Sequence, residues 1–404
     1  MKRTVFGLAI SFILIGICIW GLKKTVTASQ VPEKAESEQQ ADTYVDDYYD
    51  NFLESEQITS LEEELKGINR KYGKETGISF SDIMRYLLEG NVEEAVSYAI
   101  QMVCGNISSE LLENRMLLVK MIVLIIVAAI FNNYSSVLKS SFVGEQGFYI
   151  TYLMIAVLLM QSFTLVYGIT EETVYYIKEI MECMLPAFYM SIILCSGLTT
   201  SQMVNTMFLW MLSLIEKVLL NVVLPGIRIY FLIIVLNQIN AKDRFSKLAG
   251  LIKQGIQFLL KSIVTGIIGI NVMKSILLPV YDNAKYSVLQ KGLSAVPGGA
   301  AFSGLSTILI GAGVLIKNSV GLAVAAILLV LGSVPLLKIF CFYIIYRVIL
   351  AMVQPISDRR ILAGIQGAAD STGILLRAAM TSIVLSVLSI AIILLTTNVR
   401  LYTS

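Results

Sequence analysis

The chain has 404 residues, of which 56% are hydrophobic and only 15% charged, and its formal net charge is +2. Soluble domains carry about 25% charged residues, so this composition excludes an ordinary soluble protein. The apolar stretches lie in residues 116–404, and many of them approach the roughly 20 residues that cross a bilayer as a helix. The sequence therefore predicts an all-α, polytopic membrane protein with about seven to ten membrane segments.

The small net charge hides an asymmetry between two parts of the chain. Residues 29–115 contain 19 acidic and 7 basic residues, whereas residues 116–404 contain 10 acidic and 20 basic residues. No nucleic-acid-binding motif accompanies the basic excess, which therefore indicates membrane topology. The chain has no histidine, and its five cysteines lack metal-site spacing. We therefore expect neither a metal site, a cofactor nor a disulfide framework.

The N-terminus, residues 1–28, has the pattern of a secretory signal peptide. A basic start and an apolar core are followed by small residues that end at Ala28, the expected cleavage site. Lys23 and Lys24 follow the apolar core, which is also compatible with an uncleaved anchor helix. Both alternatives place the next residues outside the cytoplasm.

Two extracytoplasmic regions follow the signal. Residues 29–66 are acidic and polar, which predicts a flexible linker with a helix near residues 58–66. Residues 67–116 carry amphipathic patterns typical of short helices. These helices are too few for a large core, so we expect them to pack on the membrane part or on a partner.

The membrane part divides into first spans at residues 117–182 and two later units. The expected segments are 117–137, 148–168, 183–200, 202–217, 218–239, 259–280, 302–316, 319–335, 336–353 and 374–396. The short segments in 183–217 and 302–335 either cross the membrane or form re-entrant hairpins within it. The positive-inside rule places loops 240–257 and 354–373 in the cytoplasm and the acidic loop 169–182 outside.

The two later units resemble each other. The words KDRFSKLAGLI (242–252) and SDRRILAGIQG (357–367) are preceded by Pro225 and Pro335, and the copies are offset by 110 to 116 residues. The sequence therefore predicts a parallel internal duplication, with membrane repeat A at residues 183–280 and membrane repeat B at residues 294–397. The alternative is chance similarity between apolar segments.

Three sets of residues are candidates for a functional role. The charged members of the repeated word either cap helices or contact a partner: Asp243, Arg244, Asp358, Arg359 and Arg360. The charges inside apolar segments either reach the membrane surface or act in the membrane: Arg228, Lys261, Lys274, Lys338, Arg347 and Arg377. A stripe of small residues suits close helix packing or a pore: Gly299, Ser303, Thr307 and Gly311. No acid is expected in mid-span, which counts against an ion-coupled transporter.

Several stretches together resemble the stage III sporulation protein AE family of endospore-forming Firmicutes. They are SFSDIMRYLLEGNVEEAV, LPGIRIYFLIIVLNQI, VPGGAAFSGLSTILIGAGVLIKNSVGLA and QPISDRRILAGIQGAADSTG. The resemblance implies a multi-pass protein of the mother cell, located in the outer membrane around the forespore.

The resemblance also implies partners and a role. The family belongs to a set of stage III membrane proteins, AA to AH, thought to meet a forespore membrane protein across the intermembrane space. The expected function is a non-enzymatic subunit of this transenvelope secretion channel, which sustains late forespore gene expression. The alternative is a self-contained permease of two repeats that feeds small molecules to the forespore. The family carries over no catalytic residue, and neither a nucleic acid nor a metal is expected as a ligand.

Overall fold

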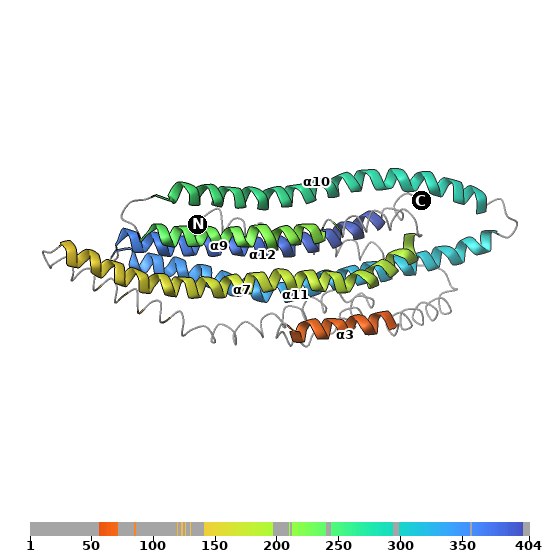
Figure 1. The fold of residues 1–404 in the computed structure, drawn as a ribbon. Helices are drawn as coiled ribbons and strands as arrows, with labels where there is room; N and C mark the ends of the chain where they lie inside the picture. Colours follow the sequence, from red (N-terminus) through yellow and green to blue (C-terminus); the bar gives the residue numbers. More distant parts are fainter. Residues whose placement is uncertain are drawn as a thin grey trace.

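The computed structural model describes residues 56–71, 141–196, 212–239, 244–293, 299–355 and 358–398, together with the single residues 85, 119, 123, 126, 130 and 210. Within these residues the chain is helical, and the helices lie side by side in one elongated bundle (Figure 1). The elements are α3 (Glu56–Lys71), α7 (Ser141–Ser196), η1 (Leu219–Val223), α9 (Leu224–Asn237), α10 (Ser246–Leu293), α11 (Gly299–Val353) and α12 (Arg359–Asn398).

Five helices in the described part are long and apolar enough to cross a membrane. The corresponding segments are Gln146–Cys183, Leu212–Asn237, Ser246–Ile270, Ser319–Val353 and Arg359–Ala391. The protein is therefore an all-helical membrane protein. The expected signal (1–28) with Ala28 and most of segment 117–137 lie outside the described residues.

The helices are longer than the segments that hydropathy separates. The 56 residues of α7 extend over about 84 Å at 1.5 Å per residue, which exceeds the thickness of a bilayer. The expected loop 169–182 is wrong, because these residues continue α7 without a break. Their charges fit a helix that projects beyond the bilayer, where Lys178 pairs with Glu182 at 3.5 Å, one turn apart.

The second half of the chain shows the same difference. The segments 302–316, 319–335 and 336–353 are one helix, α11, so a re-entrant hairpin at 302–335 is wrong. Helices α10 and α12 begin at Ser246 and Arg359, so most of the expected loops 240–257 and 354–373 is helical. Small and charged residues lower the hydropathy locally but leave helical hydrogen bonding intact, because helices tolerate both types in their interior.

Two prolines occupy corresponding places in the two expected repeats. Pro225 lies at the start of α9, after the π-helical turn η1, in which the Leu224 N–H reaches the Leu219 carbonyl. Pro335 lies inside α11. Proline has no N–H and its ring crowds the preceding turn, and a widened π turn accommodates such a defect within a helix.

The two prolines are followed by similar helical hairpins. In repeat A the hairpin consists of α9 and α10, and in repeat B of the end of α11 and α12. Both connecting turns lie at the same end of the bundle (Figure 1), as the positive-inside rule requires. After its proline, α11 continues to Val353, six residues more than α9 continues after its own proline, to Asn237. This difference accounts for most of the change in offset between the copies along the chain.

The core lies between α7, α9, α11 and α12. Helix α12 is the central element: 78% of its apolar window is buried, against 17% for α10, which runs along one edge of the bundle (Figure 1). Glycines allow the close approach. A Cβ at Gly367 would lie 2.2 Å from Ile234 of α9, and one at Gly364 would lie 3.1 Å from the Tyr152 hydroxyl of α7.

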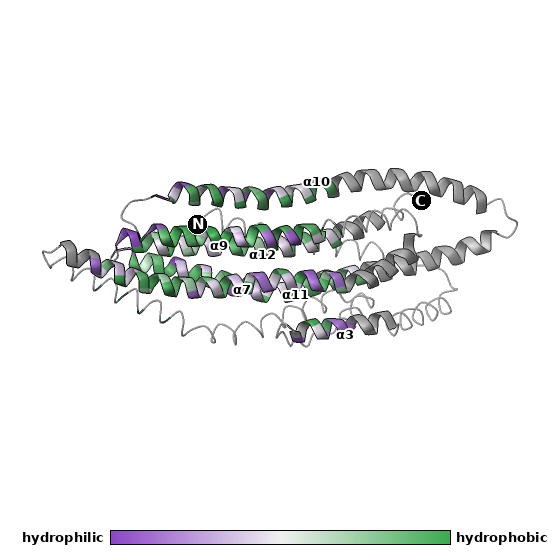
Figure 2. Cartoon of the chain, viewed as in Figure 1, coloured by the Kyte–Doolittle hydropathy of each residue, from purple (hydrophilic) through white to green (hydrophobic). Residues whose placement is uncertain are grey.

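The small helix α3 packs on α7, outside the core of the bundle. Its sequence is acidic, yet Leu65 is buried against the bundle. The hydropathy colouring shows green, apolar residues along the described helices and purple, polar residues on α3, on the second half of α7 and at the end of the bundle where α12 begins (Figure 2). An extracytoplasmic helix resting on the projecting part of α7 agrees with this pattern.

Candidate functional site

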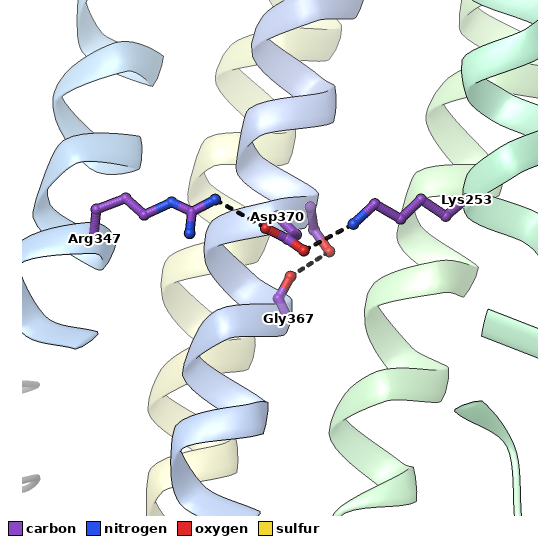
Figure 3. A network of polar contacts seen from close by, with 5 residues as sticks. Lys253, Arg347, Gly367 and Asp370 are labelled. Carbon is purple, nitrogen blue, oxygen red and sulfur yellow. Dashed lines mark hydrogen bonds and ion pairs between the residues drawn. The ribbon is translucent and has the colours of Figure 1, made fainter. Parts of the chain in front are cut away.

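The most distinctive polar feature in the described residues is a network of three charged side chains on three helices. Asp370 of α12 lies between Arg347 of α11 and Lys253 of α10 (Figure 3). Its Oδ1 accepts a hydrogen bond from the Arg347 guanidinium at 3.0 Å, and its Oδ2 accepts one from Lys253 Nζ at 2.8 Å. Both carboxylate oxygens are therefore engaged with cations.

Asp370 lies eleven residues after the start of α12, about three helical turns into a candidate membrane span. The sequence places it in a loop, so the expectation that no acid lies in mid-span is wrong. The misplacement arises because Arg359, Arg360 and Gln366 lower the hydropathy before Asp370, although the helix already begins at Arg359.

The network is half-buried and has one positive charge in excess. The side chains of Arg347 and Lys253 are each 32% exposed, and that of Asp370 is 21% exposed. Each cation also faces an aromatic ring: Arg347 lies 5.3 Å from the Tyr343 centroid and Lys253 lies 5.8 Å from the Tyr230 centroid. Such contacts stabilise a cation away from bulk water.

The contact between Lys253 and Asp370 joins the two expected repeats. Lys253 belongs to repeat A and Asp370 to repeat B, and they are 117 residues apart, close to the offset between the copies. By the alignment of the two Leu-Ala-Gly words, Lys253 corresponds to Gly367, about one helical turn before Asp370 in α12. This is the contact that a parallel pair of hairpins would make across its interface.

The repeated word is used differently in its two copies. In repeat B the Asp358 carboxylate accepts a hydrogen bond from the Arg360 N–H at 2.8 Å, so Asp358 caps the start of α12. Arg360 itself lies over the Phe148 ring of α7, at 3.6 Å from its centroid. Arg359 is exposed.

In repeat A the cap comes from the preceding helix. The Asn237 Oδ1 accepts hydrogen bonds from the Arg244 N–H at 3.2 Å and from the Phe245 N–H at 2.9 Å. Asp243 lies outside the described residues. The Asn237 side chain thus closes the turn between α9 and α10 and fixes where α10 begins.

The remaining candidates are not brought together by the fold. Arg228 of α9 lies 5.6 Å from the Tyr167 ring centroid on α7, and Lys261 of α10 is exposed. Arg377 is half-buried on α12. The small-residue stripe lies at the start of α11, where the structure describes the helix but not the side chains: Gly299, Ser303, Thr307 and Gly311. The structure likewise does not describe the side chain of Lys274.

A buried acid lies near the other end of the bundle, where the hydropathy pattern puts the boundary between two expected segments. Glu216 is 3% exposed, and no hydrogen bond within the described residues reaches its Oε1. Its nearest charged neighbours are Glu182 and Lys178 of α7. Lys217, the next residue in the chain, is exposed, because adjacent residues of a helix point in different directions.

The fold and the network together define a class of protein, a polytopic helical membrane protein whose helices are joined by a polar network. The described residues contain no cluster of three or more metal-ligating side chains. A family model described as stage III sporulation protein AE matches residues 78–397, which is most of the chain. The chain belongs to the stage III sporulation protein AE family.

A curated relative agrees with this assignment. The chain is similar to the stage III sporulation protein AE of Bacillus subtilis (strain 168), with 21% identity over 249 residues. The alignment covers 61% of this chain and 62% of the relative, so it spans less than two thirds of either protein. No solved structure matches the chain.

Proposed function

We propose that this protein is a non-enzymatic subunit of the channel or secretion complex that connects the mother cell with the forespore. Family membership assigns it to stage III of sporulation, and its helices assign it to a membrane. The proposed location is the outer of the two forespore membranes. The proposed partners are the other stage III membrane proteins, with a forespore protein meeting them across the intermembrane space.

The observation that carries the proposal is that the charged side chains within the candidate spans bind one another. Both oxygens of Asp370 are bonded to cations of neighbouring helices, so the acid is engaged in holding α10, α11 and α12 together. A carboxylate that bound and released a coupling ion would need a free oxygen and a path to it. The family match covers all five candidate spans, which extends the proposal to the whole membrane part.

The permease alternative keeps one argument in its favour. An acid inside a candidate span is a feature of ion-coupled transporters, and Asp370 supplies one. Uptake of small metabolites by the purified full-length protein in liposomes, lost in an Asp370→Asn variant, would support a permease and oppose the subunit proposal. Absence of uptake by a correctly folded protein is the result we expect.

The direct test is genetic and biochemical. Deletion of the gene in its endospore-forming host should arrest development at stage III, with forespore gene expression failing late, and the intact gene should restore it. The tagged full-length protein, purified from sporulating cells, should carry other stage III membrane proteins with it. Normal spore formation by the deletion strain would overturn the proposal.

A further inference from the structure

The outward faces of the spans fall into two kinds. Exposed side chains of α7 are large and apolar, as are those of α11, and both sets suit contact with lipid tails: Ile150, Leu153, Met154, Val157 and Met160 on α7, and Ile344, Val348 and Met352 on α11. These two helices show what a lipid-facing surface looks like in this protein.

Helix α10 has an outward surface of the other kind. Its exposed residues with helical spacing form one surface, called here the α10 face: Lys247, Leu248, Leu251, Gln254, Gly255, Phe258, Lys261, Ser262, Thr265, Gly266 and Gly269. Three of them, Leu248, Leu251 and Phe258, are large and apolar, and the other eight are small, polar or charged. Ile268 and Ile270 are exposed at the two sides of this surface. Small and polar residues in a membrane helix are typical of contact with another helix, because they allow close approach and hydrogen bonding.

The glycines of this face have no neighbour in the described structure. A Cβ added at Gly255, Gly266 or Gly269 would meet nothing within 4 Å. In α12, by contrast, a Cβ at Gly367 would be 2.2 Å and one at Gly373 would be 3.0 Å from a side chain of a neighbouring helix. Glycine is thus used for packing in α12, while the glycines of the α10 face are open.

The repeated Leu-Ala-Gly word gives a second, independent comparison. Its glycine in repeat B, Gly364, packs against Tyr152 of α7, whereas the corresponding Gly250 in repeat A has nothing within 4 Å. Among the residues that the structure describes, helix α10 packs mainly on α9 and α12, and no further helix lies on its outer side (Figure 1). Within the described part of the chain, repeat A therefore has no counterpart of α7, the helix that packs on repeat B.

The charge of Lys261 indicates what kind of helix would fit the α10 face. Lys261 is exposed fifteen residues into α10, inside a candidate span, and no ion pair with it occurs among the described residues. A second copy of the chain pairing through the same surface in the same orientation would place Lys261 beside Lys261, which is repulsive. A helix that carries a carboxylate at this depth would neutralise the charge.

We propose that the α10 face docks a transmembrane helix of a different subunit, whose carboxylate lies opposite Lys261 and whose backbone approaches Gly255 and Gly266. The inference rests on the proposed function, since it names a surface through which this protein joins the complex. Two side-chain positions within the face, Phe258 and Thr265, and one on the lipid-type face of α7, Val157, provide the matched comparison.

The test is photo-crosslinking in membranes of sporulating cells, with a benzophenone amino acid at position 258, 265 or 157 of the full-length protein. We expect an adduct at 258 and 265 with a membrane protein whose crosslinked peptide is a carboxylate-bearing transmembrane segment, and none at 157. Lys261→Glu should reduce the adduct at least tenfold, and exchanging the partner's acid for lysine should restore it. Lipid adducts alone at all three positions, or an adduct with a second copy, would overturn the proposal.

A steric variant separates docking from folding. Gly266→Ile places its side chain in open space, so the thermal midpoint of the purified protein should stay unchanged while the adduct is lost. Lys261→Leu gives a second route, because leucine suits lipid better than lysine but cannot pair with an acid. If both variants keep the adduct and support normal sporulation while the deletion strain arrests, the docking surface is wrong and the proposed function stands. If the deletion strain forms spores, the proposed function fails first.

Discussion

At the scale of single residues, the most informative side chain is Asp370. It neutralises part of the charge of Arg347 and Lys253 and binds both, at 3.0 and 2.8 Å. Removing one partner of a buried ion pair is costly because the remaining charge keeps its desolvation without compensation. In this network two cations would remain when the single acid is removed.

The variant Asp370→Asn should therefore destabilise the protein. The side chains are partly exposed, so we expect a loss of about 1–3 kcal/mol rather than the larger cost of a fully buried pair. The measurement is the unfolding midpoint of the purified protein in detergent. Lys66→Gln is the control, since Lys66 is exposed on α3 and pairs only with Glu62 one turn away among the ion pairs of the described residues, so it should change the midpoint little. Equal stability of Asp370→Asn and the wild type would show that the network does not hold the helices.

Glu216 should behave in the opposite way. It is an almost fully buried acid that receives no hydrogen bond at Oε1 from the described residues, so its charge is poorly compensated. Glu216→Gln keeps the shape and removes the charge, which should raise the unfolding free energy by about 1 kcal/mol. Lys217→Gln, at the exposed neighbouring position, is the matched control. A large loss of stability in Glu216→Gln would indicate an ionic partner for Glu216.

At the scale of elements, the space around glycine differs between helices. Gly367 brings α12 against Ile234 of α9, whereas Gly266 of α10 has open space around its Cα. The same substitution therefore has two opposite expected effects, and the difference measures how tightly each helix is packed.

Gly367→Ala should destabilise the protein by about 1–3 kcal/mol, because the added methyl would overlap Ile234. Gly266→Ala should be neutral or stabilising by up to about 1 kcal/mol, since alanine favours a helix over glycine. Both values come from denaturant titration of the two variants side by side. Similar losses at both positions would mean that α10 is packed by a further helix of the same chain.

Hydropathy predicted that the chain is a helical membrane protein, and the positions of the basic residues predicted that the two turns lie at the same end of the bundle. Both predictions succeed because these properties depend only on composition and charge. It did not predict the helix boundaries. Small residues at 299–313 and charges at 169–182 lower local hydropathy, but backbone hydrogen bonds continue through both in α11 and α7. A break in hydropathy is therefore not a break in a helix.

The ion network shows a similar limit. The sequence singled out Arg347 but not its partners, since nothing local in a sequence relates Lys253 to a residue 117 positions away. One signal was present: the Asp358 cap fixes the helix start, and counting on from it places Asp370 three turns inside α12. The alignment of the two Leu-Ala-Gly words then matches Lys253 with Gly367, within about one helical turn of Asp370.

At the scale of the whole molecule, the chain forms an elongated bundle in which two helical hairpins turn at the same end. The Lys253–Asp370 pair connects the hairpins, and α7 covers repeat B but not the outer side of α10. Among the described residues this arrangement leaves the outer side of α10 uncovered, as the proposed docking of a partner helix requires.

The orientation of the two hairpins is tested most directly by cysteine accessibility in intact membranes. In a chain without its native cysteines, Phe245→Cys and Gln354→Cys place one thiol in each turn. An impermeant thiol reagent should label neither from the extracytoplasmic side, and both should react once the cytoplasmic side is opened. Labelling of one turn from each side would contradict the parallel hairpins, and with them the contact between the two repeats.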